Sequence, residues 1–142
     1  MKVLFLDIDG VVNCVTTAQR HRGAIGIDPY MALLVDRIIQ ATGCKVVLSR
    51  TWRLFPESRK EVEKQVCKFI DVTKSMPLKG GVEMHERGKE VAEWLSRHPE
   101  VERYAILDDS RDFMPDQPLF NTSWSTGLTQ EIANDVIAHL NA

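Results

Sequence analysis

Near its N-terminus the chain reads VLFLDIDG over residues 3–10, where four apolar residues run directly into two aspartates. A short, uninterrupted apolar run with β-branched and aromatic members is typical of a strand that is buried on both faces. Such strands occur in parallel sheets, because helices cover both faces of those sheets. The stretch therefore predicts a strand over residues 3–6 that ends at Asp7.

Similar apolar runs recur along the chain and alternate with helix-like segments. Further buried strands are expected at 45–48 (KVVL) and 104–107 (YAIL), with shorter strands at 70–72 and near 119–120. Strands that alternate with helices predict an open parallel sheet with right-handed crossovers and helices on both faces. We therefore expect an α/β fold with a Rossmann-like sheet, in one domain over residues 1–142.

The helices are predicted from apolar spacing and from residues that start or stop a helix. Asp28 and Pro29 have the residue types of an N-cap and a first helical position, and an apolar stripe from Tyr30 to Ile38 stops at Gly43. Comparable patterns predict helices over 56–69, over 88–97 and after Thr129. The stretch 73–86 contains Pro and Gly and is expected to form a loop.

The composition narrows the class of protein. Its 142 residues suit one domain, and 44% hydrophobic with 27% charged residues is typical of globular chains. A formal net charge of -2 provides no long-range attraction to nucleic acid. Three cysteines form neither a disulfide framework nor a zinc motif, which indicates reduced thiols in a cytoplasmic protein. Apolar runs are too short for a membrane span or a secretory leader.

Polar residues follow the three longest predicted strands at the point where each ends. Asp7 and Asp9 follow the first strand, Ser49 follows the second, and Asp108 and Asp109 follow the third. Ligands of parallel α/β sheets bind at the carboxyl ends of the strands. We therefore expect these five side chains to converge in one site.

Carboxylates that converge in this way repel one another. Two unit charges about 4 Å apart cost roughly 4 kcal/mol at an effective dielectric of 20. The site therefore requires protonation or a cation. Oxygen ligands select a hard ion, and a few carboxylates beside a phosphate suit Mg²⁺ better than Ca²⁺.

The spacing of Asp7 and Asp9 suggests two different roles. Residues two apart in an extended segment share a face, with Cα atoms roughly 6–7 Å apart. One carboxylate can attack phosphorus while the other transfers a proton, as covalent catalysis through an acyl phosphate requires. Gly10 allows the chain to turn sharply after the pair.

Together these segments resemble the haloacid dehalogenase (HAD) superfamily. The resemblance rests on DIDGVV at 7–12, VVLS at 46–49, a basic helix start at 87–89 and ILDDS at 106–110, in that order. Within the superfamily, VLSRTWR at 47–53 and RGKEVAEWL at 87–95 are most similar to the small phosphatase-like HAD domains of RNA-repair proteins and polynucleotide kinase-phosphatases.

The resemblance implies a Mg²⁺-dependent phosphatase, a phosphomonoester hydrolase that works through an aspartyl-phosphate. Asp7 would be the nucleophile, and Asp9 would protonate the leaving oxygen and then activate water. Ser49 would hydrogen-bond the transferring phosphoryl group. Arg87 or Lys89 would steady the phosphate, with Lys79 as a third candidate outside the motif.

The same resemblance implies a ligand set for the magnesium ion. The ligands would be the Asp7 carboxylate, the main-chain carbonyl of Asp9 and the Asp109 carboxylate. Asp108 would either orient these groups or serve as an alternate ligand.

The substrate is expected to be large, because no large cap domain fits into the chain. Only about 18 residues separate Asp9 from Asp28, and residues 50–86 hold one helix and a loop. An open site admits a phosphate on a polynucleotide end or a protein side chain. Gly10, Arg50 and Arg53 are the expected substrate contacts.

Nucleic acid is the preferred substrate by resemblance, with RNA or DNA 3′-phosphates as examples and no membrane partner. Trp52 could stack a base or anchor its loop in the core. The alternatives are a phosphoprotein or nucleotide phosphatase and a catalytically inactive HAD-fold binding module. The sequence leaves 3′ or 5′ preference and the oligomeric state open.

Overall fold

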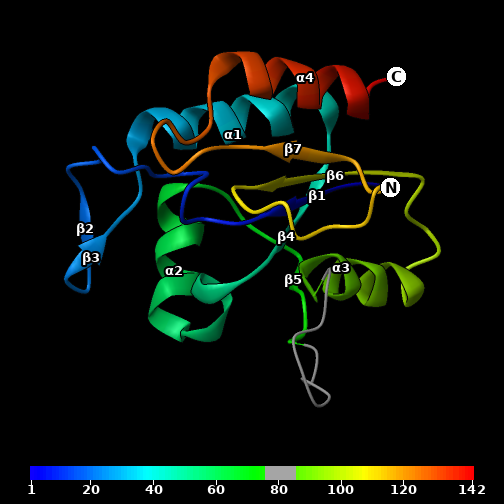
Figure 1. Ribbon diagram of the computed structural model, residues 1–142, viewed down its shortest axis with the longest axis horizontal. Coiled ribbons are helices and arrows are strands. Elements are labelled where there is room, and N and C mark those ends of the chain that lie inside the picture. The colour runs from blue at the N-terminus through cyan, green and yellow to red at the C-terminus, as the bar shows by residue number, and fades with distance from the viewer. Residues whose placement is uncertain (76–85) are drawn as a thin grey trace.

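A five-stranded sheet forms the centre of the computed structural model, which describes residues 1–75 and 86–142 (Figure 1). The strands are β1 (Lys2–Leu6), β4 (Lys45–Leu48), β5 (Asp71–Val72), β6 (Arg103–Asp108) and β7 (Leu119–Asn121). They lie in the order β5-β4-β1-β6-β7, and every neighbouring pair is parallel. The predicted α/β fold with a parallel, Rossmann-like sheet is confirmed.

Helices cover both faces of this sheet. The helices of the described residues are α1 (Pro29–Thr42), α2 (Pro56–Gln65), α3 (Glu86–Ser96) and α4 (Gln130–Leu140). α1 and α4 lie side by side on one face, and α3 lies on the other (Figure 1). A 3₁₀ helix, η1 (Thr51–Leu54), leads from β4 into α2, whose Val62 packs into the core under α1.

The predicted ends of α1 are confirmed, but one of its predicted core residues is wrong. Asp28 accepts a hydrogen bond from the Tyr30 N–H at 3.0 Å, and Gly43 ends the helix in the left-handed conformation. Tyr30 is 56% exposed. The buried stripe starts one residue later, at Met31, and a shift of one residue turns a side chain by about 100° around the helix.

α2 is shorter than the predicted helix over 56–69. It ends at Gln65, and the N–H groups of Val66 and Cys67 both donate to the Val62 carbonyl. The chain then becomes extended, because the Ile70 N–H must reach the Val46 carbonyl at 2.9 Å to start the pairing of β5 with β4. Sheet pairing therefore overrides the helical spacing of the apolar residues.

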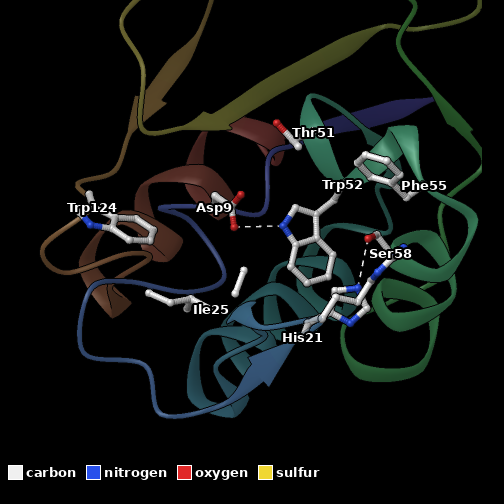
Figure 2. Close-up of a pocket in the computed structure, with 10 residues that line it drawn as sticks. Asp9, His21, Ile25, Thr51, Trp52, Phe55, Ser58 and Trp124 are labelled. Atoms are coloured by element: carbon white, nitrogen blue, oxygen red, sulfur yellow. Dashed lines mark hydrogen bonds between the residues drawn. The ribbon is translucent and has the colours of Figure 1, made fainter.

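A small hairpin that the sequence patterns do not predict lies between Asp9 and α1. β2 (Arg20–His21) and β3 (Ala24–Ile25) pair antiparallel around Arg22 and Gly23, which both have positive φ. The hairpin lies against α2, where the His21 ring bonds the Ser58 hydroxyl at 3.1 Å (Figure 2). Between Asp9 and α1 the described chain thus builds a hairpin and no large cap. The predicted loop over 73–86 and Lys79 fall mostly on residues 76–85, outside the described residues.

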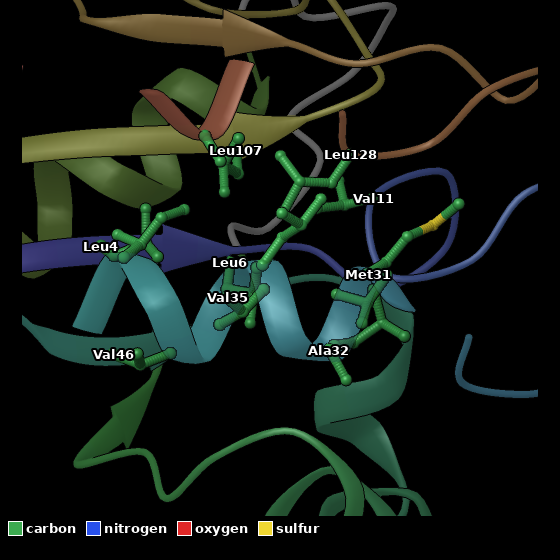
Figure 3. Packing of buried hydrophobic residues seen from close by; sticks show 14 of the residues in the cluster. Leu4, Leu6, Val11, Met31, Ala32, Val35, Val46, Leu107 and Leu128 are labelled. Atoms are coloured by element: carbon green, nitrogen blue, oxygen red, sulfur yellow. The ribbon is translucent and has the colours of Figure 1, made fainter. Parts of the chain in front are cut away.

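β1 is buried on both faces, as its apolar run predicts. Leu4 and Leu6 point into the core between the sheet and the α1–α4 pair (Figure 3). Val3 and Phe5 point to the opposite face, where the Phe5 ring meets the edge of Trp94 with ring centroids 5.5 Å apart. No helix within the described residues is long and apolar enough to cross a membrane.

Candidate active site

Three aspartates meet at the carboxyl ends of β1 and β6. Asp7 follows β1, Asp108 is the last residue of β6, and Asp109 comes next. β1 and β6 are neighbours with Leu6 opposite Leu107, so their ends lie together. Each of the three aspartates offers a carboxylate oxygen, and these atoms lie within 4.8 Å of one another. We call Asp7, Asp108 and Asp109 the acidic cluster.

Among the described residues, the acidic cluster brings more negative charge together than the ion pairs of Arg87 balance. Asp7 is 5% exposed and Asp108 only 1%. Burial raises the pKa of Asp7 well above its ordinary value, and the nearby Asp108 adds to the shift. Burial also raises the pKa of Asp108. The Arg87 guanidinium faces the pair, with Nη1 2.7 Å from Asp108 Oδ1 and 3.4 Å from Asp7 Oδ2.

This donor set fits a divalent metal ion. Three carboxylates from two adjacent strand ends supply oxygen atoms only, as hard cations require. A cation among them would also balance the charge that Arg87 leaves uncompensated. Asp108 belongs to this group, which agrees with its predicted role as an alternate metal ligand.

The Asp9 carboxylate lies apart from the acidic cluster. Its Oδ1 accepts hydrogen bonds from Asn13 Nδ2 and from Trp52 Nε1, each at 3.0 Å. Its predicted role as a metal ligand concerned the main-chain carbonyl and stays a prediction. The two aspartates therefore differ in environment: Asp7 is buried, whereas Asp9 is partly exposed.

Asn13 holds the turn after β1 and was missed in the sequence. It is fully buried, accepts a hydrogen bond from the Gly10 N–H at 2.9 Å and donates to the Gly26 carbonyl at 2.9 Å. It thereby ties Asp9 to the hairpin segment. A polar residue inside the apolar stretch VVNCV at 11–15 is the signal that could have identified it.

Gly10 makes the sharp turn that the sequence predicts. Its φ is +80°, and a Cβ at this position would lie 2.5 Å from Cγ of Asp109. Only glycine therefore allows the loop after β1 to approach the acidic cluster so closely. A direct contact of Gly10 with substrate stays a prediction.

The loop after β4 brings Ser49 to the same sheet edge. Ser49 is buried, and its N–H donates to the Leu6 carbonyl at 2.9 Å. The next residue, Arg50, has φ 66° and ψ -151°, a conformation that is nearly confined to glycine. Its side chain bonds Glu90 at 3.2 Å. Ser49 and Arg50 both line a small cavity with Asp108 and Arg87.

Arg53 is turned into the protein, and its predicted contact with substrate stays a prediction. Arg53 is 4% exposed, and its Nη1 lies 3.1 Å from Glu90 Oε2. The same guanidinium donates to Thr73 and Ser75, at 3.1 and 2.7 Å. A buried carboxylate such as Glu90 needs cationic partners, and Arg53 fulfils that need inside the protein. Glu90 itself was missed because a glutamate on a helix gives no sequence signal of burial.

Arg87, in the first turn of α3, contacts two members of the acidic cluster. Its N–H also lies 3.3 Å from Asp112 Oδ2, which helps to fix the start of α3. Lys89 is partly buried two residues further along. Residues two apart on a helix do not face the same direction. The placement therefore favours Arg87 for the predicted phosphate contact.

A second region, which borders Asp9, is an open pocket of about 770 Å³ (Figure 2). We call it the aromatic pocket, and it is lined by Asp9, His21, Arg22, Ala24, Ile25, Thr51, Trp52, Phe55, Ser58 and Trp124. Trp52 is 6% exposed and stacks on the His21 ring with centroids 4.7 Å apart. Its ring therefore anchors the loop and lines the pocket at once. Phe55 and Trp124 were missed in the sequence.

Comparison with known proteins gives one match. A family model described as the HAD domain in Swiss Army Knife RNA repair proteins matches residues 3–133, which confirms the resemblance seen in the sequence. No curated protein and no solved structure matches the chain. The matched span contains both the acidic cluster and the aromatic pocket.

Proposed function

The chain belongs to the family of HAD domains in Swiss Army Knife RNA repair proteins, and from this membership we propose that it is a Mg²⁺-dependent phosphomonoesterase. The observation that carries the proposal is the acidic cluster. It holds a buried carboxylate, Asp7, beside two further carboxylates and the guanidinium of Arg87. A phosphoryl group placed there meets a nucleophile, a cation site and a fixed positive charge.

Asp7 is the nucleophile in this proposal. One of its carboxylate oxygens attacks phosphorus, the bond from phosphorus to the leaving oxygen breaks, and an aspartyl-phosphate forms on Asp7. Asp9 gives its proton to the leaving alcohol oxygen. Asp9 then takes a proton from water as that water attacks phosphorus, which releases inorganic phosphate and restores Asp7.

The remaining residues stabilise charge. Asp7, Asp108 and Asp109 would hold Mg²⁺, which when bound neutralises phosphoryl oxygens and carboxylates together. In this proposal Arg87 and Ser49 donate hydrogen bonds to the phosphoryl oxygens. The ion pair of Arg87 with Asp108 fixes the guanidinium before substrate arrives, so little ordering is needed during the reaction.

Nucleic-acid ends are the substrates that we propose, with polynucleotide 3′-phosphates first. The description of the matching family as a domain of RNA repair proteins supports this choice. The absence of a large cap from the described residues between Asp9 and α1 also supports it, because a polynucleotide end can then approach the site.

A substrate panel tests the proposal. Phosphate release is measured from RNA and DNA oligonucleotides with 3′ or 5′ phosphates, from phosphopeptides and from mononucleotides, with Mg²⁺ or with EDTA. We expect Mg²⁺-dependent release from oligonucleotide ends that Asp7→Asn abolishes. The matched control is Asp116→Asn, the same substitution at an exposed aspartate outside the acidic cluster. Turnover of phosphopeptides with no release from any oligonucleotide would contradict the proposal.

A further inference from the structure

We propose that the aromatic pocket binds the unpaired base of the terminal nucleotide whose phosphate lies at the acidic cluster. This inference rests on the proposed function and extends it to the form of the nucleic-acid end. Asp7 belongs to the acidic cluster, and Asp9, two residues further along the chain, lines the pocket.

The position of Asp9 determines the direction in which the substrate extends from the acidic cluster. The group that protonates the leaving oxygen must lie beside that oxygen, so the part of the substrate bonded to it extends past Asp9. For a nucleic-acid end the leaving oxygen belongs to the terminal sugar, and the base is attached to that same sugar. The aromatic pocket begins at Asp9, where this sugar and base must be accommodated.

The pocket lining suits a flat aromatic ligand. Trp124 and Phe55 are 43% and 47% exposed, although large aromatic side chains on a surface usually find cover. Trp52 and His21 present a stacked pair of rings from the pocket wall. Bases stack on aromatic side chains with little dependence on sequence, because every base has a π-face. About 770 Å³ is ample for one nucleoside.

The charges around the pocket favour a base over a second phosphate. Arg22, the cation among the lining residues, lies 3.2 Å from the carboxylate of Glu57 and over the Phe55 ring. Its charge is therefore partly balanced. Polar groups such as the hydroxyls of Thr51 and Ser58 remain at the wall, where they can orient the edge of a base.

A base within a duplex cannot enter the pocket, since its faces are covered by neighbouring bases and its edge by its partner. The ligand is therefore a single-stranded or frayed end. A phosphopeptide side chain is the competing occupant, and it differs from a nucleotide in having no base attached to the leaving group.

The experiment compares oligonucleotides that differ only at the terminal base. Each single-stranded oligonucleotide carries a terminal phosphate on either a normal nucleotide or an abasic residue, and kcat/KM is measured for both. We expect the normal end to be preferred at least about 10-fold, which corresponds to about 1.4 kcal/mol. Trp124→Ala should remove most of this preference. Tyr30→Ala, an exposed aromatic outside the pocket, should keep it.

The outcomes separate this inference from the proposed function. Equal kcat/KM on normal and abasic ends would overturn the base pocket and leave the phosphatase intact. Turnover of phosphopeptides alone, with dependence on Trp124, would overturn both. Fluorescence anisotropy with a dye-labelled, unphosphorylated oligonucleotide needs no turnover. Binding that weakens about 10-fold in Phe55→Ala and Trp124→Ala, but not in Asp7→Asn, would support the pocket, and identical binding in all variants would contradict it.

Discussion

The acidic cluster and the aromatic pocket differ in how the chain builds them. The cluster stands on the ends of two adjacent central strands, so the sheet fixes its geometry. The pocket is assembled from the hairpin, η1, the start of α2 and the loop after β7. In the proposed function, reaction chemistry would rest on the sheet and recognition on its periphery, a division that lets one fold serve many substrates.

The two regions also differ in what they lack before a ligand binds. The acidic cluster has excess negative charge in a buried place, whereas the aromatic pocket has exposed rings with space between them. A cation would therefore balance the charge of the acidic cluster, and a flat apolar group would cover the rings of the aromatic pocket. Asp9 lies at the border between the two regions, because its carboxylate accepts a hydrogen bond from the indole N–H of Trp52.

The largest expected effect is a loss of turnover on substitution of Asp7, with no change in binding at the aromatic pocket. Asp7→Asn should lower kcat on every phosphomonoester by at least about 10⁴-fold, because it removes the nucleophile. Binding of an unphosphorylated oligonucleotide should stay within about 2-fold, which is within the scatter of neutral substitutions. Asp116→Asn is the control for both assays. A variant that retains turnover would refute the role of Asp7.

The next effect concerns Glu90, which supports both regions. Glu90→Gln leaves the buried Arg53 without a counter-charge and should lower the free energy of unfolding by about 3–5 kcal/mol. The loop after β4 carries both Ser49 and Trp52, so turnover and oligonucleotide binding should fall together. Urea unfolding measures the first effect.

The matched control for Glu90 lies on the same helix. Glu93→Gln removes an i,i+4 ion pair with Arg97 at the surface, and it should lower the free energy of unfolding far less than Glu90→Gln does, because solvent screens the pair. If the two variants cost the same, the buried network would not support the site.

A smaller effect is expected at Gly10. Gly10→Ala forces a Cβ into the Asp109 carboxylate at a positive φ, with a cost of about 1–3 kcal/mol. Gly43→Ala has a similar positive φ but meets nothing within 4 Å, so it reproduces the backbone strain alone. Mg²⁺ affinity, measured by calorimetry, should fall in Gly10→Ala and stay unchanged in Gly43→Ala. Equal affinities would mean that Asp109 does not hold the ion.

The smallest effect is expected at Asp71, which lies outside both regions and serves as a reference. Burial alone would raise the pKa of Asp71, but hydrogen bonds from Trp94 and Val72 hold that pKa below its ordinary value. A lowered pKa in the folded state stabilises the fold above the unfolded pKa of about 3.9 and loses this effect as pH falls through the folded pKa.

Asp71→Asn should therefore lower the free energy of unfolding at pH 7 by about 1 kcal/mol or less, because solvent screens the group. The difference between the urea midpoints of the variant and the original protein should shrink as pH falls below about 3.9. A difference that persists at low pH would show that the charge of Asp71 is not the cause. The phosphatase activity should be unaffected.

Much of the fold could be predicted because local patterns and tertiary structure agree. The runs at β1, β4 and β6 are apolar enough to specify buried strands, and Asp28 and Gly43 mark both ends of α1. The end of α2 could not be predicted, because it depends on pairing of Ile70 with Val46 rather than on helical spacing. The hairpin lacks a strong turn signal, because arginine, the residue type at position 22, rarely adopts the positive φ that Arg22 has here.

The site was predictable where the sheet alone decides it. Asp7, Asp108 and Asp109 meet because parallel neighbouring strands end together. Sequence cannot show that Asp9 turns toward Trp52, nor that Arg53 turns inward to Glu90, because both depend on contacts between distant segments. The aromatic pocket is hidden for the same reason.

The most direct measurement of the central claim traps phosphate on the acidic cluster. Asp9→Asn is incubated with radiolabelled p-nitrophenyl phosphate, a substrate whose leaving group needs no proton, and is then quenched in acid. We expect label on Asp7 that depends on Mg²⁺ and is released by hydroxylamine, because loss of Asp9 leaves water without its base. Turnover without label on Asp7, or label on another residue, would contradict the claim that Asp7 attacks phosphorus.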